Sequence, residues 1–429
     1  MERVEKNCIY WWAHPSRIVL FVHLPLLLMC AAMSDSDYAI YGHKTKFLTG
    51  QALLVAVVGL LAFAAASVCF EPQYTTGTAT KRLDPVRFRT TINGLAFLVL
   101  SAYAIFLFPI VLKPQLLLEH FSGSSTAMYT LRETLNHVPG LTSLMALQSL
   151  LLILILSYRQ LTGENMPSSY PAIIVVTVIA CLLRVLLWSE RLALIELALP
   201  VIILLFARVA PACRNVAIPA LALAPLGGAL ALALLFAAGE YFRTWQYYQY
   251  RYSGTFLEFI AVRLAGYYAT ALNNGAALTT LVDPFMAPIG TAQWIAKFPM
   301  WGWLGLDPGG YTFNNMTFLE SYLNVEFNNM GGIFLPIADF GIVLGVLCWV
   351  MMGLVSGKLF NSFALGRITG LLLYPVWFTG IAEMLRVFYW GETRFFPMLA
   401  GGLIVIWIVG GFAEDDTACP LPDTEAVPS

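Results

Sequence analysis

Arg184 and Arg191 are the first residues whose type and placement suggest chemistry. Both belong to one eight-residue piece of an otherwise apolar stretch, and Glu190 directly precedes Arg191. A guanidinium binds phosphate oxygens in pairs and stays charged at physiological pH. An arginine near membrane depth costs about 3 kcal/mol on insertion scales, so this pair needs a reason. Binding of a phosphate group is one reason, and snorkelling to lipid headgroups is the other.

More arginines and many aromatic rings follow in residues 240–330. Of these 91 residues, 21 are Phe, Trp or Tyr, against 14% in the whole chain. Rings offer flat apolar faces to sugar C–H groups and Arg, Gln and Asn bind hydroxyls, so the segment suits a glycan groove. An amphipathic helix over 241–252 at headgroup level is the alternative. The candidate anion binders are Arg184, Arg243, Arg251, Arg263 and Arg386, and the candidate stacking rings are Trp245, Tyr248, Trp301 and Trp303.

Carboxylates accompany these arginines. Glu383 and Arg386 are three residues apart on a predicted helix, so we expect them to pair. Asp339 opens the triplet Asp339-Phe340-Gly341 inside an apolar run, where an uncompensated charge would be costly. We therefore expect Asp339 to be buried against one of the arginines.

The elements that position these residues are membrane helices. The chain is 59% hydrophobic and only 11% charged, whereas a water-soluble domain has about a quarter charged residues. Apolar runs of about 17 to 25 residues can span a bilayer as helices. About ten are present, which predicts an all-α, polytopic transmembrane bundle of 10 to 12 spans, at 18–33, 47–70, 91–112, 141–157, 170–188, 191–207, 216–239, 331–355, 368–389 and 395–412.

The Lys/Arg bias of the short loops predicts the orientation. The loop at 71–90 carries Lys81, Arg82, Arg87 and Arg89 and is expected in the cytoplasm, and alternation places both termini there as well. Residues 1–429 then form one integral membrane domain of a bacterial inner membrane. It has a large periplasmic loop at 240–330, a smaller one at 113–140 and an acidic, disordered cytoplasmic tail at 413–429. This alternation requires a chain reversal near Ser189.

Several chemistries are disfavoured because their motifs do not occur. There is no P-loop, no dinucleotide-binding glycine pattern and no His-Glu-x-x-His, and the five histidines lack metal-ligand spacing. We therefore expect no metal and no cofactor, and no nucleic acid as a partner. The predicted cytoplasmic loops are too short for a nucleotide-sugar domain. A transferase of this kind would take an activated donor from the membrane on its outer side.

With these features the chain resembles the Wzy-type polymerases of O-antigen and exopolysaccharide repeat units. The resemblance is carried by Arg184, by Ser189-Glu190-Arg191-Leu192-Ala193-Leu194-Ile195-Glu196, and by the long outer loop before Asp339-Phe340-Gly341. It implies transfer of a growing glycan from undecaprenyl pyrophosphate to an incoming lipid-linked repeat unit, by inverting chemistry without a metal. It also implies a co-polymerase that sets chain length as a partner, besides the lipid-linked oligosaccharide and the bilayer.

On this resemblance the arginines stabilise the departing pyrophosphate, and a carboxylate takes the proton of the attacking hydroxyl. The catalytic candidates are Glu190 as base, Arg191 and Asp339. An O-antigen ligase, which uses the same donor, is one alternative. A flippase or transporter for lipid-linked sugar is another, although transporters typically show broken helices and internal repeats, which the sequence does not indicate.

Overall fold

The computed structural model describes residues 8–43, 45–70, 83–115, 134–135, 138, 140–188, 191–209, 223–250, 252–298 and 313–410. Almost all regular structure in these ranges is helical, as predicted. The exception is a two-residue antiparallel pairing of β1 (Cys8–Ile9) with β2 (Arg208–Val209). This pairing ties the beginning of the chain to the end of the sixth predicted span.

Six helices in the described ranges are long and apolar enough to cross a membrane, which makes the chain a multi-pass membrane protein. They comprise α1–η2–α2 (Pro15–Ile18, Val19–His23, Leu24–Ala32), α4–η3 (Gly50–Ser67, Val68–Phe70), α5 (Pro85–Leu112), α8–α9 (Leu141–Ala146, Gln148–Thr162), α10 (Tyr170–Trp188) and η7–α18 (Gly332–Phe334, Leu335–Ala364).

Four shorter apolar helices complete the bundle: α11 (Arg191–Phe206), α13 (Ala224–Glu240), α19 (Ile368–Glu383) and α20 (Phe395–Ile408). Each of these ten segments coincides with a predicted span. The polytopic helical fold is therefore confirmed, and the number of ten crossings stays a prediction. The remaining elements are η1 (Trp11–Ala13), α3 (Asp35–Ile40), η5 (Tyr241–Trp245), α14 (Gln246–Tyr248), α15 (Phe256–Leu281), α16 (Gln293–Ala296), α17 (Asn315–Tyr322) and η8 (Tyr389–Gly391).

The chain reverses between α10 and α11. This is the reversal near Ser189 that the predicted alternation of cytoplasmic and periplasmic loops requires. The Cys181 thiol lies 3.5 Å from the carbonyl oxygen of Ala193, although a continuous helix would separate these residues by about 18 Å. Trp188 and Arg191 therefore end and begin two separate helices rather than one bent helix.

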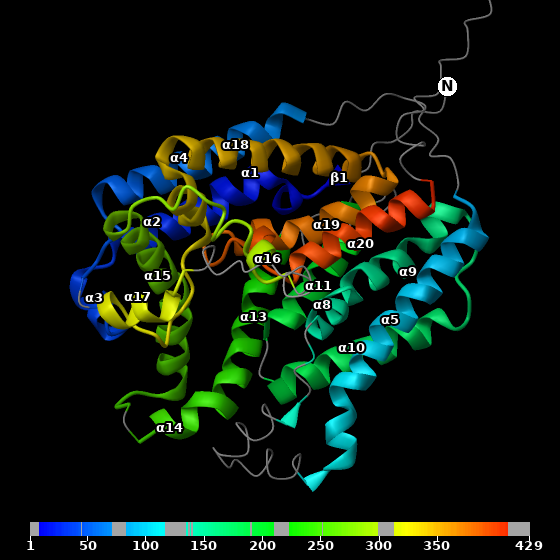
Figure 1. Ribbon diagram of the computed structural model, residues 1–429, viewed down its shortest axis with the longest axis horizontal. Helices are drawn as coiled ribbons and strands as arrows, with labels where there is room; N and C mark the ends of the chain where they lie inside the picture. The colour runs from blue at the N-terminus through cyan, green and yellow to red at the C-terminus, as the bar shows by residue number, and fades with distance from the viewer. Residues whose placement is uncertain are drawn as a thin grey trace, which may run out of the picture.

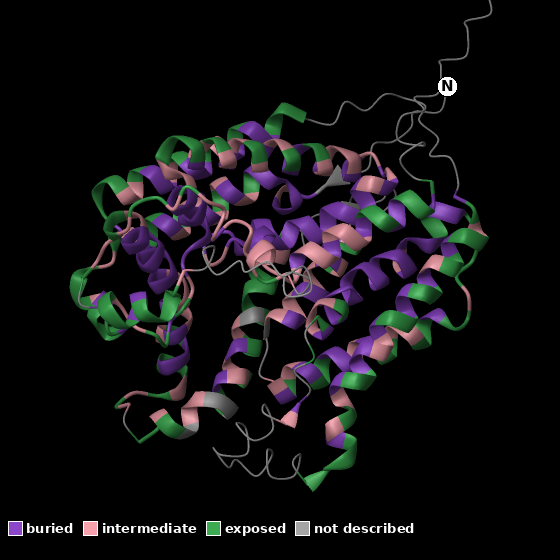
Figure 2. Ribbon diagram, in the orientation of Figure 1, coloured by how far each residue is buried: buried purple, intermediate pink, exposed green. Residues whose placement is uncertain are grey.

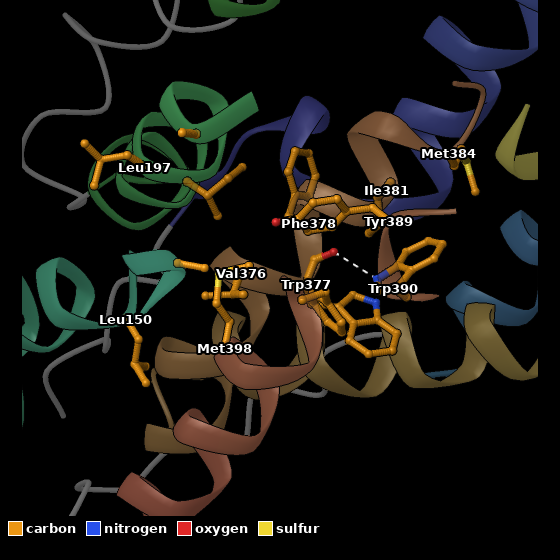
Figure 3. Packing of buried hydrophobic residues seen from close by; sticks show 14 of the residues in the cluster. Leu150, Leu197, Val376, Trp377, Phe378, Ile381, Met384, Tyr389, Trp390 and Met398 are labelled. Carbon is orange, nitrogen blue, oxygen red and sulfur yellow. Dashed lines mark hydrogen bonds between the residues drawn. The ribbon is translucent and has the colours of Figure 1, made fainter. Parts of the chain in front are cut away.

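The helix α19 forms the centre of the bundle. It is buried on all sides, and it packs against α9, α11, α18 and α20 (Figure 3). An all-round apolar helix is stable only where neighbours or lipid cover every face. Its polar contacts reach across the bundle: Trp390 donates to the carbonyl oxygen of Trp377 at 3.2 Å, and Trp377 donates to Ser356 Oγ at 2.8 Å.

The pair α4 and α18 shows how helices approach closely here. A Cβ on Gly353 would lie 2.4 Å from the carbonyl oxygen of Phe63, and one on Gly357 would lie 2.3 Å from that of Ser67. Two glycines four residues apart on one face are the small residues that membrane helices use for such contacts. Large apolar residues are exposed on the bundle, including Val343 and Phe97, both 73% exposed. Figure 2 shows exposed residues along the outward-facing sides of the helices.

The ends of the bundle separate the segments into two groups. At one end Leu83 N–H donates to Leu161 O at 2.9 Å, joining two segments that the Lys/Arg bias places on the same side. At the other end Asn324 Nδ2 donates to Tyr41 O at 2.7 Å. This second end, called the outer end below, gathers α3, α17 and the segments 283–298 and 384–394 (Figure 1). Its assignment to the periplasm stays a prediction.

Residues 240–330 are not simply a loop, because their longest element is the 26-residue helix α15. Thr255 and Glu258 form a capping box at its start, and its second half is buried. Figure 1 shows α15 running across the direction of α4 and α18. Segment 113–140 lies mostly outside the described residues, as does the tail at 413–429.

Candidate functional site

The helix α15 organises the outer end through two adjacent asparagines. Asn273 Oδ1 accepts the N–H groups of Phe47 and Leu48 at 2.6 and 3.1 Å, while its amide donates to Thr45 O. Asn274 Nδ2 donates to the carbonyl oxygens of Phe327 and Asn329 at 2.6 and 2.9 Å. Two chain segments far apart in sequence are thus fixed on one helix, and Arg263 lies on the same helix.

Arg263 is buried between two carboxylates. Its Nη1 lies 2.5 Å from Glu326 Oε1, and its Nε lies 3.3 Å from Glu240 Oε2. Thr244 Oγ1 also donates to Glu240 Oε2. One guanidinium therefore serves two carboxylates, so this cluster carries excess negative charge. A pyrophosphate at Arg263 would have to displace both partners, which makes Arg263 a poor clamp and a good holder of Glu326.

Aromatic rings surround the same guanidinium. The ring centroid of Phe327 lies 5.2 Å from Arg263 Cζ, and those of Phe259 and Tyr248 lie 5.7 and 5.8 Å away, within range of cation–π attraction. Tyr248 donates to Glu326, with oxygen–oxygen distances of 3.1 and 3.3 Å. Burial, and then the adjacent Glu326 carboxylate, raise the pKa of Tyr248, so the phenol stays a protonated donor.

The predicted stacking rings Trp245 and Tyr248 belong to this packing. Trp245 lies against Phe256 and Phe259, each at 5.2 Å between centroids, and Tyr248 lies 5.5 Å from Phe259. Both rings are only partly exposed. Residues 241–248 are helical, continuing from α13, as the amphipathic interpretation predicted. Glycan stacking on these two rings stays a prediction.

A second cluster lies inside the bundle around Arg184. This side chain is fully buried on α10 and hydrogen-bonds with Tyr103 of α5. The Tyr103 hydroxyl donates to Gln148 Oε1 at 2.5 Å, and Gln148 Nε2 donates to Ala193 O at 3.3 Å. Four helices thus converge on one cation at membrane depth, where ionisable groups usually mark a functional site.

Glu196 of α11 connects this cluster to the outer end. Its Oε1 accepts the Tyr389 hydroxyl at 2.9 Å and lies 3.9 Å from Arg394 Nη1. Cys181 lies within electrostatic range of both Arg184 and Glu196, so the two charges are neighbours. Arg184 therefore has a buried carboxylate nearby rather than lipid headgroups alone.

The predicted pair of Glu383 and Arg386 is confirmed. Arg386 Nε lies 2.6 Å from Glu383 Oε2 at the outer end of α19. Tyr268 of α15 is within electrostatic range of both, and Tyr267 is within range of Arg386 and of Arg263. These tyrosines join the Arg386 pair to the Arg263 cluster, so charged and phenolic groups extend across the outer end.

The expected arginine partner of Asp339 was wrong. Asp339 is fully buried, and its carboxylate accepts Gly290 N–H at 2.9 and 3.0 Å, Thr291 N–H at 2.7 Å and Thr291 Oγ1 at 2.6 Å. Neutral donors thus satisfy a buried carboxylate without a countercharge. Because the carboxylate is fully buried and both of its oxygens accept hydrogen bonds, we remove Asp339 from the catalytic candidates and regard it as an anchor for residues 283–292.

The absence of broken helices was also a wrong expectation. Within α18, Gly341 has φ +76° and ψ 176°, which interrupts the helix two residues after Asp339. A π-helical turn at Val19–His23 interrupts the first span as well. The break at Gly341 lies near the outer end of α18, and helix interruptions of both kinds are frequent at functional sites.

Several predicted site residues lie outside the described part of the chain: Glu190, Arg251, Trp301 and Trp303. For Arg191 and Arg243 the structure describes the backbone, which places Arg191 at the first position of α11 and Arg243 in η5. Among the described residues, no group of three or more His, Cys, Asp or Glu side chains is arranged to hold a metal ion.

Sequence reasoning missed Glu240, Tyr268 and Tyr389 as members of these clusters. Glu240 ends an apolar run, which is a signal that a charge faces protein rather than lipid. Nothing in the local sequence distinguishes the two tyrosines. A comparison with protein-family models, with curated proteins and with solved structures finds no match to this chain.

Proposed function

We propose that the protein polymerises lipid-linked oligosaccharide repeat units at the periplasmic face of a bacterial inner membrane. The observation that carries the proposal is a set of arginines that alternate with carboxylates and tyrosines. Those of α15 and of the segment after α19 lie at the outer end, and Arg184 of α10 lies inside the bundle next to it. On the sidedness that the Lys/Arg bias predicts, the outer-end groups face the headgroup of a lipid-linked donor. Guanidinium groups stabilise a departing pyrophosphate, and carboxylates bind sugar hydroxyls.

Arg184, Arg191 and Arg386 are the arginines that we assign to the pyrophosphate. Among the described residues, Arg386 uses Nε for Glu383, so its two terminal nitrogens present a fork to a ligand. Arg191 opens α11, where its backbone N–H adds to the positive end of the helix dipole. Arg263 is excluded from this set because two carboxylates already bind it.

The experiment is deletion of the gene followed by analysis of lipid-linked and surface glycan. Loss of a polymerase leaves single repeat units and no long chains. Long chains that accumulate on undecaprenyl pyrophosphate would instead indicate a ligase. Arg191→Ala and Arg191→Lys should both abolish chain extension while the protein still inserts in the membrane, and normal chain length in either variant contradicts the clamp.

A flippase for lipid-linked sugar is the second candidate, and the break at Gly341 favours it. Interrupted membrane helices form the binding sites of many transporters. The break lies near the outer end of α18 rather than at its middle, and the first residues of α18 are bound to segment 283–292. If deletion keeps single repeat units on the inner face of the membrane, transport replaces polymerisation as the function.

A further inference from the structure

Glu326 differs from the carboxylates around it by its exposure. Its side chain is 33% exposed, whereas those of its neighbours Arg263 and Glu240 are 7% and 0% exposed. A ligand that approaches the outer end can therefore reach Glu326 without displacing a core side chain. The buried groups behind Glu326 are available to orient it.

Three contacts fix the position of this carboxylate. Arg263 Nη1 and the Tyr248 hydroxyl bind it from α15 and α14. Its own backbone N–H donates to Asn324 Oδ1 at 3.0 Å, which fixes the turn that carries it. Each carboxylate oxygen accepts about two hydrogen bonds. Oε2 receives only the Tyr248 hydroxyl among the described groups, so it keeps an acceptor site.

The charges of the cluster keep Glu326 an effective acceptor. Arg263 alone would neutralise it, but Glu240 competes for the same guanidinium from a fully buried position. Arg263 Nη2 is also buried, and it has no hydrogen-bond partner among the described residues. The acceptor site on the exposed Glu326 carboxylate matches a hydroxyl group, which donates one hydrogen bond, while the buried guanidinium behind it holds the carboxylate in place.

We propose that Glu326 is the catalytic carboxylate that binds the attacking hydroxyl of the acceptor sugar and takes its proton. The proposal rests on the polymerase function above. The hydroxyl oxygen forms a bond to the anomeric carbon of the donor while the bond from that carbon to the pyrophosphate oxygen breaks. The electron pair leaves with undecaprenyl pyrophosphate, and the hydroxyl proton passes to Glu326, which returns it to water. Glu326 thereby replaces Glu190 as the base.

Exposed rings near this carboxylate suit the sugar that carries the hydroxyl. Tyr247, on the helical turn that bears Tyr248, is 55% exposed, and Tyr250, just after this turn, is 85% exposed. Their apolar faces and phenol groups present to the outside the combination that binding of a sugar requires. These rings suit a hydroxyl-rich glycan as the acceptor.

The test uses the full-length protein in liposomes, supplied with lipid-linked single repeat units extracted from a strain that lacks the gene. Glu326→Gln should lower kcat for chain extension by about 100-fold or more, with little change in KM, because general base catalysis contributes about 10²- to 10⁴-fold. Glu326→Ala should regain activity when formate is added, since formate supplies a carboxylate in the vacated space. Glu320→Gln, an exposed carboxylate on α17, is the matched control and should keep the wild-type rate.

The outcomes separate this inference from the proposed function. A wild-type rate in Glu326→Gln, or loss of activity in Glu190→Gln with retention in Glu326→Gln, overturns the role of Glu326 and leaves polymerisation intact. Failure of the wild-type protein to extend any chain overturns both. Size-exclusion chromatography and melting establish that each variant is folded, so that a fall in kcat with unchanged KM and unchanged melting temperature reports on the chemical step.

Discussion

Asp339 shows how a buried carboxylate can be held without a countercharge. Replacing it by Asn keeps the shape but turns one acceptor oxygen into an N–H donor that faces the amides of Gly290 and Thr291. We expect Asp339→Asn to lower the free energy of unfolding by about 1 to 3 kcal/mol. Thermal unfolding in detergent measures this. Asp283 is an exposed residue of the same segment, so Asp283→Asn should have no such effect. An equal loss of stability in both variants would contradict the role of Asp339 as an anchor of this segment.

His43 predicts a dependence of stability on pH. Burial lowers its pKa to about 4, and its Nδ1 accepts a hydrogen bond from Asn273 Nδ2 at 2.9 Å. In the unfolded chain His43 binds a proton at a higher pH, near 6.5. The contribution of His43 to the free energy of unfolding is therefore fully present above pH 6.5. It declines as the pH falls toward 4, by about 3 kcal/mol at most.

The variant His43→Asn tests this pH dependence, because its Oδ1 can accept the same bond from Asn273 but does not titrate. We expect the melting temperature of the wild-type protein to fall more steeply than that of the variant between pH 6.5 and 4.5. Identical pH profiles of the melting temperature would show that His43 is not the titrating group. The Tyr38 ring, 6.3 Å from His43, is unchanged in the variant.

The interrupted helix α18 depends on one glycine. Gly341 adopts φ +76° and ψ 176°, a conformation that only glycine reaches without strain. A Cβ there would meet Pro284 at no less than 3.7 Å, so the cost of a side chain is conformational rather than steric. We expect Gly341→Ala to reduce the free energy of unfolding by about 1 to 3 kcal/mol.

Gly94→Ala is the matched control for this prediction. Gly94 lies within α5 with no neighbouring atom within 4 Å of an added Cβ, so alanine should leave stability unchanged or raise it by up to about 1 kcal/mol. Thermal unfolding of both variants in the same detergent gives the comparison. Equal stability of Gly341→Ala and wild type would mean that α18 can straighten without cost.

The helical elements were predictable where hydropathy alone decides them. All ten apolar runs became helices because a bilayer requires every backbone group to be paired within the segment. The helix α15 escaped prediction because Glu258, Arg263 and the two asparagines break its apolar pattern. Their partners, such as Phe47 and Glu326, lie 226 and 63 residues away in the chain. No local pattern reports contacts of this kind.

The same division holds for the site. The pair of Glu383 and Arg386 was predictable because three residues on a helix bring side chains together. The partners of Asp339 were not, since Gly290 and Thr291 are backbone donors whose position depends on how segment 283–292 folds over α18. A charged residue inside an apolar run can therefore be recognised from the sequence as one that needs a partner. The packing of the folded chain determines which partner it finds.

The arrangement of the whole molecule gives a test of sidedness. Segments that the Lys/Arg bias places in the cytoplasm meet at one end of the bundle, where the backbone N–H of Leu83 donates to the carbonyl oxygen of Leu161. The helices α15 and α17 lie at the other end. Cys69 is exposed at the first end, and Ser321 is exposed on α17 at the second. A membrane-impermeant maleimide can therefore distinguish the two ends.

The measurement uses two single-cysteine variants. The first keeps Cys69 and lacks the other native cysteines, and the second carries Ser321→Cys and lacks all native cysteines. We expect the reagent to label Ser321→Cys in intact spheroplasts and Cys69 only in inverted vesicles, because the positive-inside bias places the 71–90 loop in the cytoplasm. Labelling of both from one side would contradict the separation of the two ends. Reversed labelling would place the Arg263 and Arg386 clusters in the cytoplasm, where a donor on the outer face of the membrane cannot reach them.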